Sequence, residues 1–472
     1  MRISVLRPAA PRKSQYNISP ELLTKRAAEL PNMTGVLVTD LFPDLPKPIY
    51  TPGDALTLVR EKVRAALASV DMSKIKPGDS VNILASHHGF TLYGGEPYAE
   101  MLRTIKDVIA ERTGATDIRL RAGVGLRLRE TEEYIKTFGL DEYFEGKAVG
   151  VAPVDRGIPI ETVLGTVYGI RKVYDAKWIV HAHNNDIREL HYHRQIGRLF
   201  KPFAMSYATI ETRSLYHQGL GPRAANMLPR VIFDSEFVQN KFAFSVFLVV
   251  GPTGITGVDA DNDLIRQDAR LTRFNLTCYG KIITLLSHID EAIIIMDYPG
   301  PPPYTTAGGI LFGNFLNATI DEFDLDKGMP PFTRYADMLY DEEGRSLLKD
   351  LPPVNPAIKV LVINYCSKGY PATFFAQQIP TIVVGAQAEL LENCEHNPEF
   401  MRYALKASHL EEAMTFAHRV TKTDKVLAFD GAMAGYNMSR SLAESLKRQA
   451  PNVSAEVDSV LMDKWLKQRG LG

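Results

Sequence analysis

The stretch KPGDSVNILASHHGFTLYGGEPYAEMLRTIKDVIAERTGATDIRLRAG, residues 76–123, predicts the fold of this chain. A turn at its start leads into an apolar run that ends near Ser86, which is typical of a buried strand. Residues 96–113 carry apolar side chains at helical spacing, and Gly114 is placed to end that helix. A second apolar run, residues 117–123, follows. A strand, a helix and a strand in this order predict two parallel strands in one sheet.

The same alternation continues on both sides of this unit. A helical pattern precedes it from Ala55, a short helix ending at Gly139 follows it, and residues 176–182 predict a further strand. A second series begins after the Gly- and Asp-rich residues 251–263. Its predicted strands are residues 291–297, 358–365, 381–386 and 425–431, and its predicted helices are residues 410–420 and 439–449. The pattern predicts an α/β fold with two α/β domains, mainly parallel sheets and a cleft between the domains.

The length of the chain, 472 residues, is more than one hydrophobic core usually holds. We expect the proline-rich residues 1–50 to form an irregular extension over the domain that follows. Residues 51–265 are expected to form the first domain, and residues 266–472 a second domain that closes the cleft. Ligands of such sheets bind outside the carboxyl ends of the strands, so the residues that follow each strand are candidates for a site.

The composition excludes several classes of protein. The chain is 45% hydrophobic and 23% charged with a net charge of −1, which gives no electrostatic reason to expect binding to nucleic acid or to an anionic membrane. Cys278, Cys366 and Cys394 lie far apart, so neither a disulfide framework nor a thiolate zinc site is indicated. The chain start resembles no signal peptide, and no apolar run is long enough to span a bilayer. These features predict a cytoplasmic protein.

Histidines gather in the segment HAHNNDIRELHYHRQIGRLFK, residues 181–201. It holds four of the chain's 11 histidines, His181, His183, His191 and His193, and His217 follows soon after. Two histidines separated by one residue on a strand place both rings on the same face, where they can bind a divalent cation. One hypothesis is therefore a metal site built from these histidines. The alternative is one pair that caps a strand and another that is exposed.

Three further motifs are candidates for a site. His87 and His88 follow a predicted strand, and because adjacent residues of an extended chain point in opposite directions, we expect at most one of them to serve a site. Arg127 and Arg129, after the glycines of AGVG, have side chains that can bind a carboxylate or a phosphate through two hydrogen bonds. Lys201 has apolar neighbours, and a partly buried lysine is suited to be a nucleophile or an attachment point. The alternatives are a turn histidine, a solvated run of charges and a surface lysine.

Several of these segments resemble the lactate racemase family, whose members use a nickel-pincer nucleotide. The resemblance covers about residues 54–217, including KPGDSVNILASHHG, DIRLRAGVGLRLRETEEYIKTFG and the segment that ends in ATIETRSLYH. Its most specific part is the spacing of His191, Lys201 and His217, separated by 10 and 16 residues as in the family. The resemblance implies that Lys201 tethers the cofactor through a thioamide, that His217 coordinates nickel and that His191 is a general base. Arg127 and Arg129 join Lys201 as candidates for binding the cofactor or the substrate carboxylate.

The sequence departs from the family at the residues expected to contact the substrate. The family's second catalytic histidine falls at Arg127, which cannot act as a base near neutral pH, and its arginine clamp falls near Phe90. We therefore expect His88 or His193 to serve as the second base. His87, His181 and His183 are the other histidines available for that role.

The resemblance predicts a nickel-dependent racemase or epimerase that inverts a 2-hydroxy acid other than lactate. Proton abstraction and hydride transfer to the Lys201-tethered cofactor would accomplish the inversion. Its partners would be the small hydroxy acid and, transiently, the proteins that make the cofactor. One alternative is a lyase, dehydratase or hydrolase with a divalent metal held between His181 and His193. Another is a non-catalytic protein that binds carboxylates.

Overall fold

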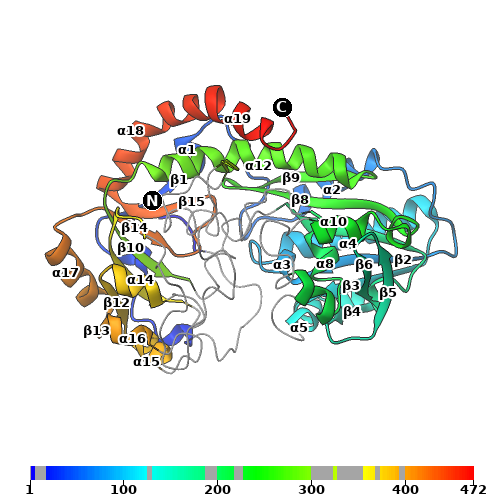
Figure 1. Cartoon of the computed structure of the whole chain (residues 1–472), viewed down its shortest axis with the longest axis horizontal. Coiled ribbons are helices and arrows are strands. Elements are labelled where there is room, and N and C mark those ends of the chain that lie inside the picture. The colour runs from blue at the N-terminus through cyan, green and yellow to red at the C-terminus, as the bar shows by residue number, and fades with distance from the viewer. Residues whose placement is uncertain are drawn as a thin grey trace.

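The computed structural model describes residues 2–5, 18–124, 130–185, 199–216, 227–298, 323–326, 354–366, 373–392 and 399–472. Within these residues, two large sheets carry the fold (Figure 1). The first has the strand order β4-β3-β2-β7-β8-β9, and the second β1-β15-β14-β10-β11-β12-β13. A separate hairpin joins β5 (Gly157–Thr162) to β6 (Gly165–Ile170). Most neighbouring strands are parallel, which confirms the predicted α/β class. The domain boundaries and the cleft stay predictions.

The first sheet is built around the predicted strand–helix–strand unit. Strand β2 (Ser80–Ser86) lies between β3 (Asp117–Gly123) and β7 (Trp178–Asn184), and both neighbours are parallel to it. The crossover helix α4 (Glu96–Thr113) begins after Gly95 and ends at Gly114, and both glycines have positive φ angles. Ile83, Leu84 and Ala85 of β2 are fully buried, as expected for a strand covered on both faces. Strands β4 (Ala148–Val151), β8 (Phe242–Gly251) and β9 (Gly254–Asp261) complete the sheet, with β9 antiparallel to β8.

The second sheet has a parallel centre and an antiparallel edge. Its parallel strands are β10 (Ala292–Asp297), β11 (Ile358–Tyr365), β12 (Thr381–Val384), β13 (Ala404–Ala407) and β14 (Val426–Phe429). Strand β15 (Gly435–Ser439) runs antiparallel to β14, and β1 (Met33–Leu37) runs antiparallel to β15.

Part of residues 1–50 differs from the irregular extension that the proline content predicts. Strand β1 adds to the edge of the second sheet, pairing Met33 with Ser439 and Leu37 with Gly435. The short helix α1 (Val38–Leu41) follows it directly. Val36 and Val38 are fully buried in the core of that sheet. This placement gives the backbone of β15, which would otherwise be an edge strand, a partner for its N–H and carbonyl groups.

Helices cover both sheets, and one of them links the two cores. Helix α12 (Leu264–Ser287) runs along the top of Figure 1, above both sheets. Its first turns bury Leu264 and Leu271 with the first sheet, and its later turns bury Leu276 and Tyr279 with the second. The other α-helices include α2 (Thr57–Ala68), α3 (His87–Phe90), α5 (Glu130–Thr137), α8 (Lys201–Ala204), α9 (Ile210–Ser214), α10 (Met227–Phe233), α17 (Leu410–Thr421) and α18 (Arg440–Glu456).

Six further short α-helices belong to the described residues. They are α6 (Leu140–Tyr143), α11 (Glu236–Gln239), α14 (Thr373–Gln378), α15 (Ala386–Glu392), α16 (Phe400–Tyr403) and α19 (Met462–Lys467). None of the helices in the described ranges combines the length and the apolar character needed to cross a membrane.

Candidate active site at the carboxyl ends of the first sheet

Four of the candidate histidines come together where β2 and β7 end. His87 and His88 begin α3 directly after β2, and His181 and His183 lie on the last part of β7. The two strands are parallel neighbours, with Leu84 opposite His181, so their carboxyl ends meet at one edge of the sheet. This is the edge at which parallel sheets bind ligands. We call His87, His88, His181 and His183 the histidine group.

His183 forms a hydrogen-bonded chain with Ser86 of the neighbouring strand. Its Nδ1 lies 3.0 Å from the carbonyl oxygen of Asn184, and because a carbonyl only accepts, Nδ1 carries the proton. Nε2, 2.6 Å from Ser86 Oγ, is then the acceptor of the serine hydroxyl. The order of groups is that of a nucleophile, its base and an orienting group. Ser86 is fully buried, however, so the arrangement fixes the ring of His183 rather than exposing a nucleophile.

His181 is a buried structural histidine. Its Nε2 donates to the carbonyl of Leu199 at 2.9 Å, and its Nδ1 lies 2.8 Å from the hydroxyl of Tyr207, from which it accepts. The residue is fully buried, and burial lowers the pKa of the imidazole to about 4. With both nitrogens bonded to protein groups, His181 serves neither as a metal ligand nor as a spare base, contrary to two of the expectations from the sequence.

The pH dependence of stability should report on His181. Because its folded-state pKa is about 4 and its ordinary value 6.5, the unfolded chain gains a proton as the pH falls through this range and the folded chain does not. His181 should therefore cost the fold about 2 kcal/mol between pH 7 and pH 5. Urea unfolding of the wild-type protein and of His181→Gln at the two pH values measures this. The variant should lose less stability on acidification, and equal losses would show that His181 titrates normally.

His87 and His88 lie side by side, unlike the opposite directions expected of adjacent extended residues. Their ring centroids are 4.6 Å apart in an edge-to-face arrangement, and the ring of His88 lies 6.5 Å from that of His183. The difference arises because both residues start α3 instead of extending β2. His87 Nε2 also lies 3.5 Å from a carboxylate oxygen of Glu130, the first residue of α5. The edge therefore holds a row of imidazoles that ends at a carboxylate.

Tyr98 ties the two strand ends together, a role that the sequence did not reveal. Its hydroxyl donates to the carbonyl of Ala182 at 2.7 Å and accepts from the amide of Ser86 at 3.2 Å. Burial raises the pKa of this hydroxyl well above its ordinary value, so it stays a donor. A Cβ on Gly89 would lie 2.3 Å from the Tyr98 ring. The glycine of SHHG is the sequence signal of this close packing.

Replacing Gly89 with alanine should destabilise the protein by about 1–3 kcal/mol, because the added methyl group overlaps the Tyr98 ring. Gly257→Ala, on strand β9 of the first sheet, is the control, since nothing lies within 4 Å of the position of its Cβ. Chemical denaturation of both variants measures the difference. Equal stability of the two variants would mean that Tyr98 moves aside without cost.

Lys201 begins α8 in a partly buried position. Its neighbours Phe200 and Pro202 are buried, and so is Phe203 one residue further on. The segment after α8 packs against the end of β3, where a Cβ on Gly123 would lie 2.3 Å from the carbonyl oxygen of Ser206. Gly123, the first glycine of AGVG, therefore permits this close contact because it has no side chain. Lys201 is therefore partly buried rather than fully exposed, and its role as an attachment point stays a prediction.

The other predicted site residues, His191, His193, His217, Arg127 and Arg129, lie outside the described residues. A buried arginine that no motif indicated lies close to this edge. Arg213 of α9 donates to the carbonyls of Val124 and Ala208, and burial lowers its pKa to about 10. In the described ranges, no group of three or more His, Cys, Asp or Glu side chains is placed to hold a metal ion.

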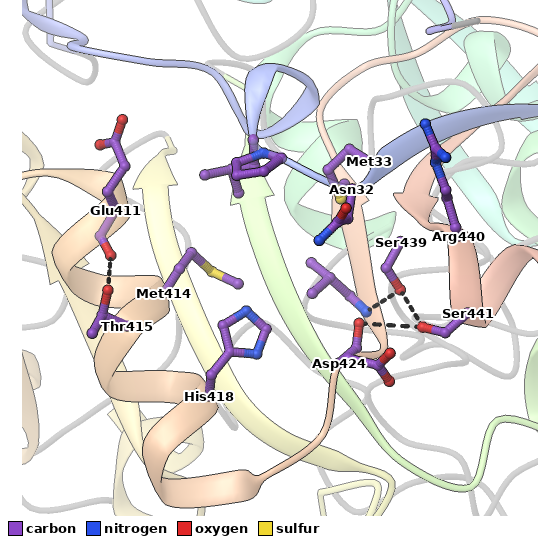
Figure 2. Close-up of a pocket in the computed structure, with 13 residues that line it drawn as sticks. Asn32, Met33, Glu411, Met414, Thr415, His418, Asp424, Ser439, Arg440 and Ser441 are labelled. Atoms are coloured by element: carbon purple, nitrogen blue, oxygen red, sulfur yellow. Dashed lines mark hydrogen bonds between the residues drawn. The ribbon is translucent and has the colours of Figure 1, made fainter.

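A pocket of about 360 Å³ lies away from the histidine group, beside the second sheet (Figure 2). It is found where β14 begins, β15 ends and α17 packs, and Met33, Met414 and His418 are among the residues that line it. Of the site residues predicted from the sequence that the structure describes, none lines this pocket. It is therefore separate from the candidate site.

Comparison with known proteins gives distant likenesses to solved structures alone. No protein-family model matches the chain, and no curated protein matches it. Among solved structures, the lactate racemase apoprotein from Thermoanaerobacterium thermosaccharolyticum covers 84% of this chain and 95% of its own, at 12% sequence identity and a TM-score of 0.42. At this level the likeness assigns neither a family nor a function.

Proposed function

We propose that this protein is a racemase or epimerase of a 2-hydroxy acid, with Lys201 as the attachment point of a nickel-pincer nucleotide. The observation that carries the proposal is the position of Lys201. It begins a short helix whose preceding turn is bonded to β7 through His181, and β7 also presents His183 to the histidine group. Strand β7 therefore connects the chain just before Lys201, through His181, to the edge at which His183 and the rest of the histidine group lie.

The residues around Lys201 fit a covalently held cofactor. Lys201 is partly buried between buried neighbours, and an amine is a suitable point for a permanent linkage. His217 would supply an imidazole to nickel, in keeping with the sequence resemblance, and such a single protein ligand needs no preformed cluster of metal-binding side chains. When bound, the cofactor would accept a hydride from the substrate carbon and return it.

The protein's own task is to move the hydroxyl proton on each face of the substrate. His191 is the first base by its spacing from Lys201. We assign the second to His88, which is partly exposed at the strand edge with its ring against His87 and near His183. His181 is excluded by its burial, and both ring nitrogens of His183 contact protein groups. An imidazole suits this task because its ordinary pKa lies near neutral pH.

The competing metal-lyase hypothesis loses support from the same geometry. It needs His181 as a ligand, and both nitrogens of that ring are bonded to Leu199 and Tyr207. Chiral chromatography of 2-hydroxy acids, with protein purified from a host that makes the cofactor, tests the two functions together. Interconversion of the two enantiomers supports the racemase. Loss of water or cleavage of the carbon chain, without interconversion, supports the lyase.

A further inference from the structure

The backbone of Leu199, two residues before Lys201, is held on both sides by side chains from other elements. Its carbonyl accepts from His181 Nε2 of β7 at 2.9 Å. Its amide donates to Asp268 Oδ1 of α12 at 3.4 Å. Leu199 itself is buried. Two elements distant in the sequence therefore fix the point at which the chain enters the Lys201 helix.

The same imidazole also holds the chain after that helix. His181 Nδ1 accepts the hydroxyl of Tyr207 at 2.8 Å, and Tyr207 is fully buried. The amide of Tyr207 donates to the carbonyl of Pro202 at 2.9 Å, and its carbonyl accepts from the amide of Ile170 at 2.8 Å. The ring of Phe203 also packs 5.3 Å from that of His181. One histidine thus contacts the chain on both sides of Lys201.

These bonds matter because α8 cannot fix its own position. It contains four residues, about one turn, and a single turn has almost no intrinsic stability in water. Packing alone does not explain a histidine here, since an apolar side chain of similar size would fill the space without the cost of burying two polar atoms. A neutral imidazole, by contrast, donates to Leu199 and accepts from Tyr207 at the same time.

We propose that His181 is a positioning residue for Lys201, and that Asp268 provides the second support. Together they set where the lysine side chain leaves the backbone relative to His183, which lies on the same face of β7 with its ring 6.0 Å from that of His181. What Lys201 carries rests on the proposed function. The role of His181 in fixing the backbone around Lys201 does not depend on the proposed function.

The test compares variants of His181 by hydrogen–deuterium exchange of the peptides that cover residues 199–207. His181→Phe keeps a ring of similar size and removes both hydrogen bonds, so exchange there should rise about tenfold or more. His181→Gln keeps a donor and an acceptor and should restore much of the protection. His418→Phe is the matched control, because it removes one histidine-to-carbonyl hydrogen bond, to Thr423, from the other sheet. Its exchange at residues 199–207 should equal that of the wild type.

A second measurement follows Lys201 directly. In the same variants, the rate at which an amine-reactive ester labels Lys201, read by peptide mass spectrometry, should change several-fold in His181→Phe and return toward wild type in His181→Gln. Labelling of Lys241 serves as the internal reference. Unchanged exchange and labelling in a folded His181→Phe protein would overturn the proposal. If that variant does not fold, Tyr207→Phe, which removes the bond to His181 together with the hydroxyl's contact with the carbonyl of Leu84, decides by the same two measurements.

The proposed function can be contradicted without contradicting the positioning role of His181. In a host that makes the cofactor, the fraction of Lys201 modified should fall in His181→Phe relative to the wild type. An unmodified wild-type protein would overturn the proposed function, while the exchange measurement would still support or contradict the role of His181.

Discussion

Replacing Lys201 with arginine should abolish interconversion of hydroxy-acid enantiomers, a loss of at least about a thousandfold in kcat/KM. Arginine keeps the positive charge and nearly the same length, but a guanidinium does not provide the amine that the linkage needs. Under the proposed function, the protein without the attached cofactor would have no acceptor for the hydride. The variant should also purify without nickel from a host that makes the cofactor.

Lys241→Arg is the matched control for this substitution. Lys241 is another partly buried lysine of the first sheet, and its Nζ donates to the carbonyl of Ala176 at 2.8 Å. This variant should keep wild-type activity and nickel content. Full activity of Lys201→Arg would show that the lysine is not the attachment point.

Replacing His88 with glutamine should lower kcat/KM by about 100- to 10,000-fold, the usual contribution of a general acid or base. Glutamine retains hydrogen bonding but cannot take up a proton. If His88 serves one face of the substrate, the pH–rate profile in one direction of the reaction should lose a limb. Rates in both directions, measured by chiral chromatography across pH 5–9, would show this.

His409→Gln is the control for a general effect of losing a histidine. His409 is an exposed N-cap residue of α17, far along the chain from the histidine group. Wild-type rates in His88→Gln would assign the second proton transfer to another group, with His193 as the next candidate.

The sequence predicted those parts of the fold that repeat a simple pattern. Strand β2, helix α4 and strand β3 were expected because a buried run, helical spacing and a terminal glycine lie next to one another in the sequence. Strand β1 was missed because its five residues do not alternate regularly between buried and exposed. Its partner, β15, also lies about 400 residues further along the chain, at Gly435–Ser439. Such a pairing leaves no local signal.

For the described part of the candidate site, the sequence predicted the placement of two histidines but not what their rings contact. The spacing of His181 and His183 placed both rings on one face of a strand, which the structure shows. Their roles depend on groups that folding brings near, Leu199 and Tyr207 for one ring and Ser86 for the other. Tyr98 was missed for the same reason, since its partners Ser86 and Ala182 lie 12 and 84 residues away.

If Lys201 carries a cofactor, the mass of the intact protein should show it. The wild-type chain, produced together with the proteins that make the nickel-pincer nucleotide, should show an intact mass above that of the unmodified chain. Peptide mapping should place the added mass on Lys201, and Lys201→Arg should lack it. If the wild-type protein has the mass of the unmodified chain, in a host in which a lactate racemase is modified, Lys201 does not carry the cofactor.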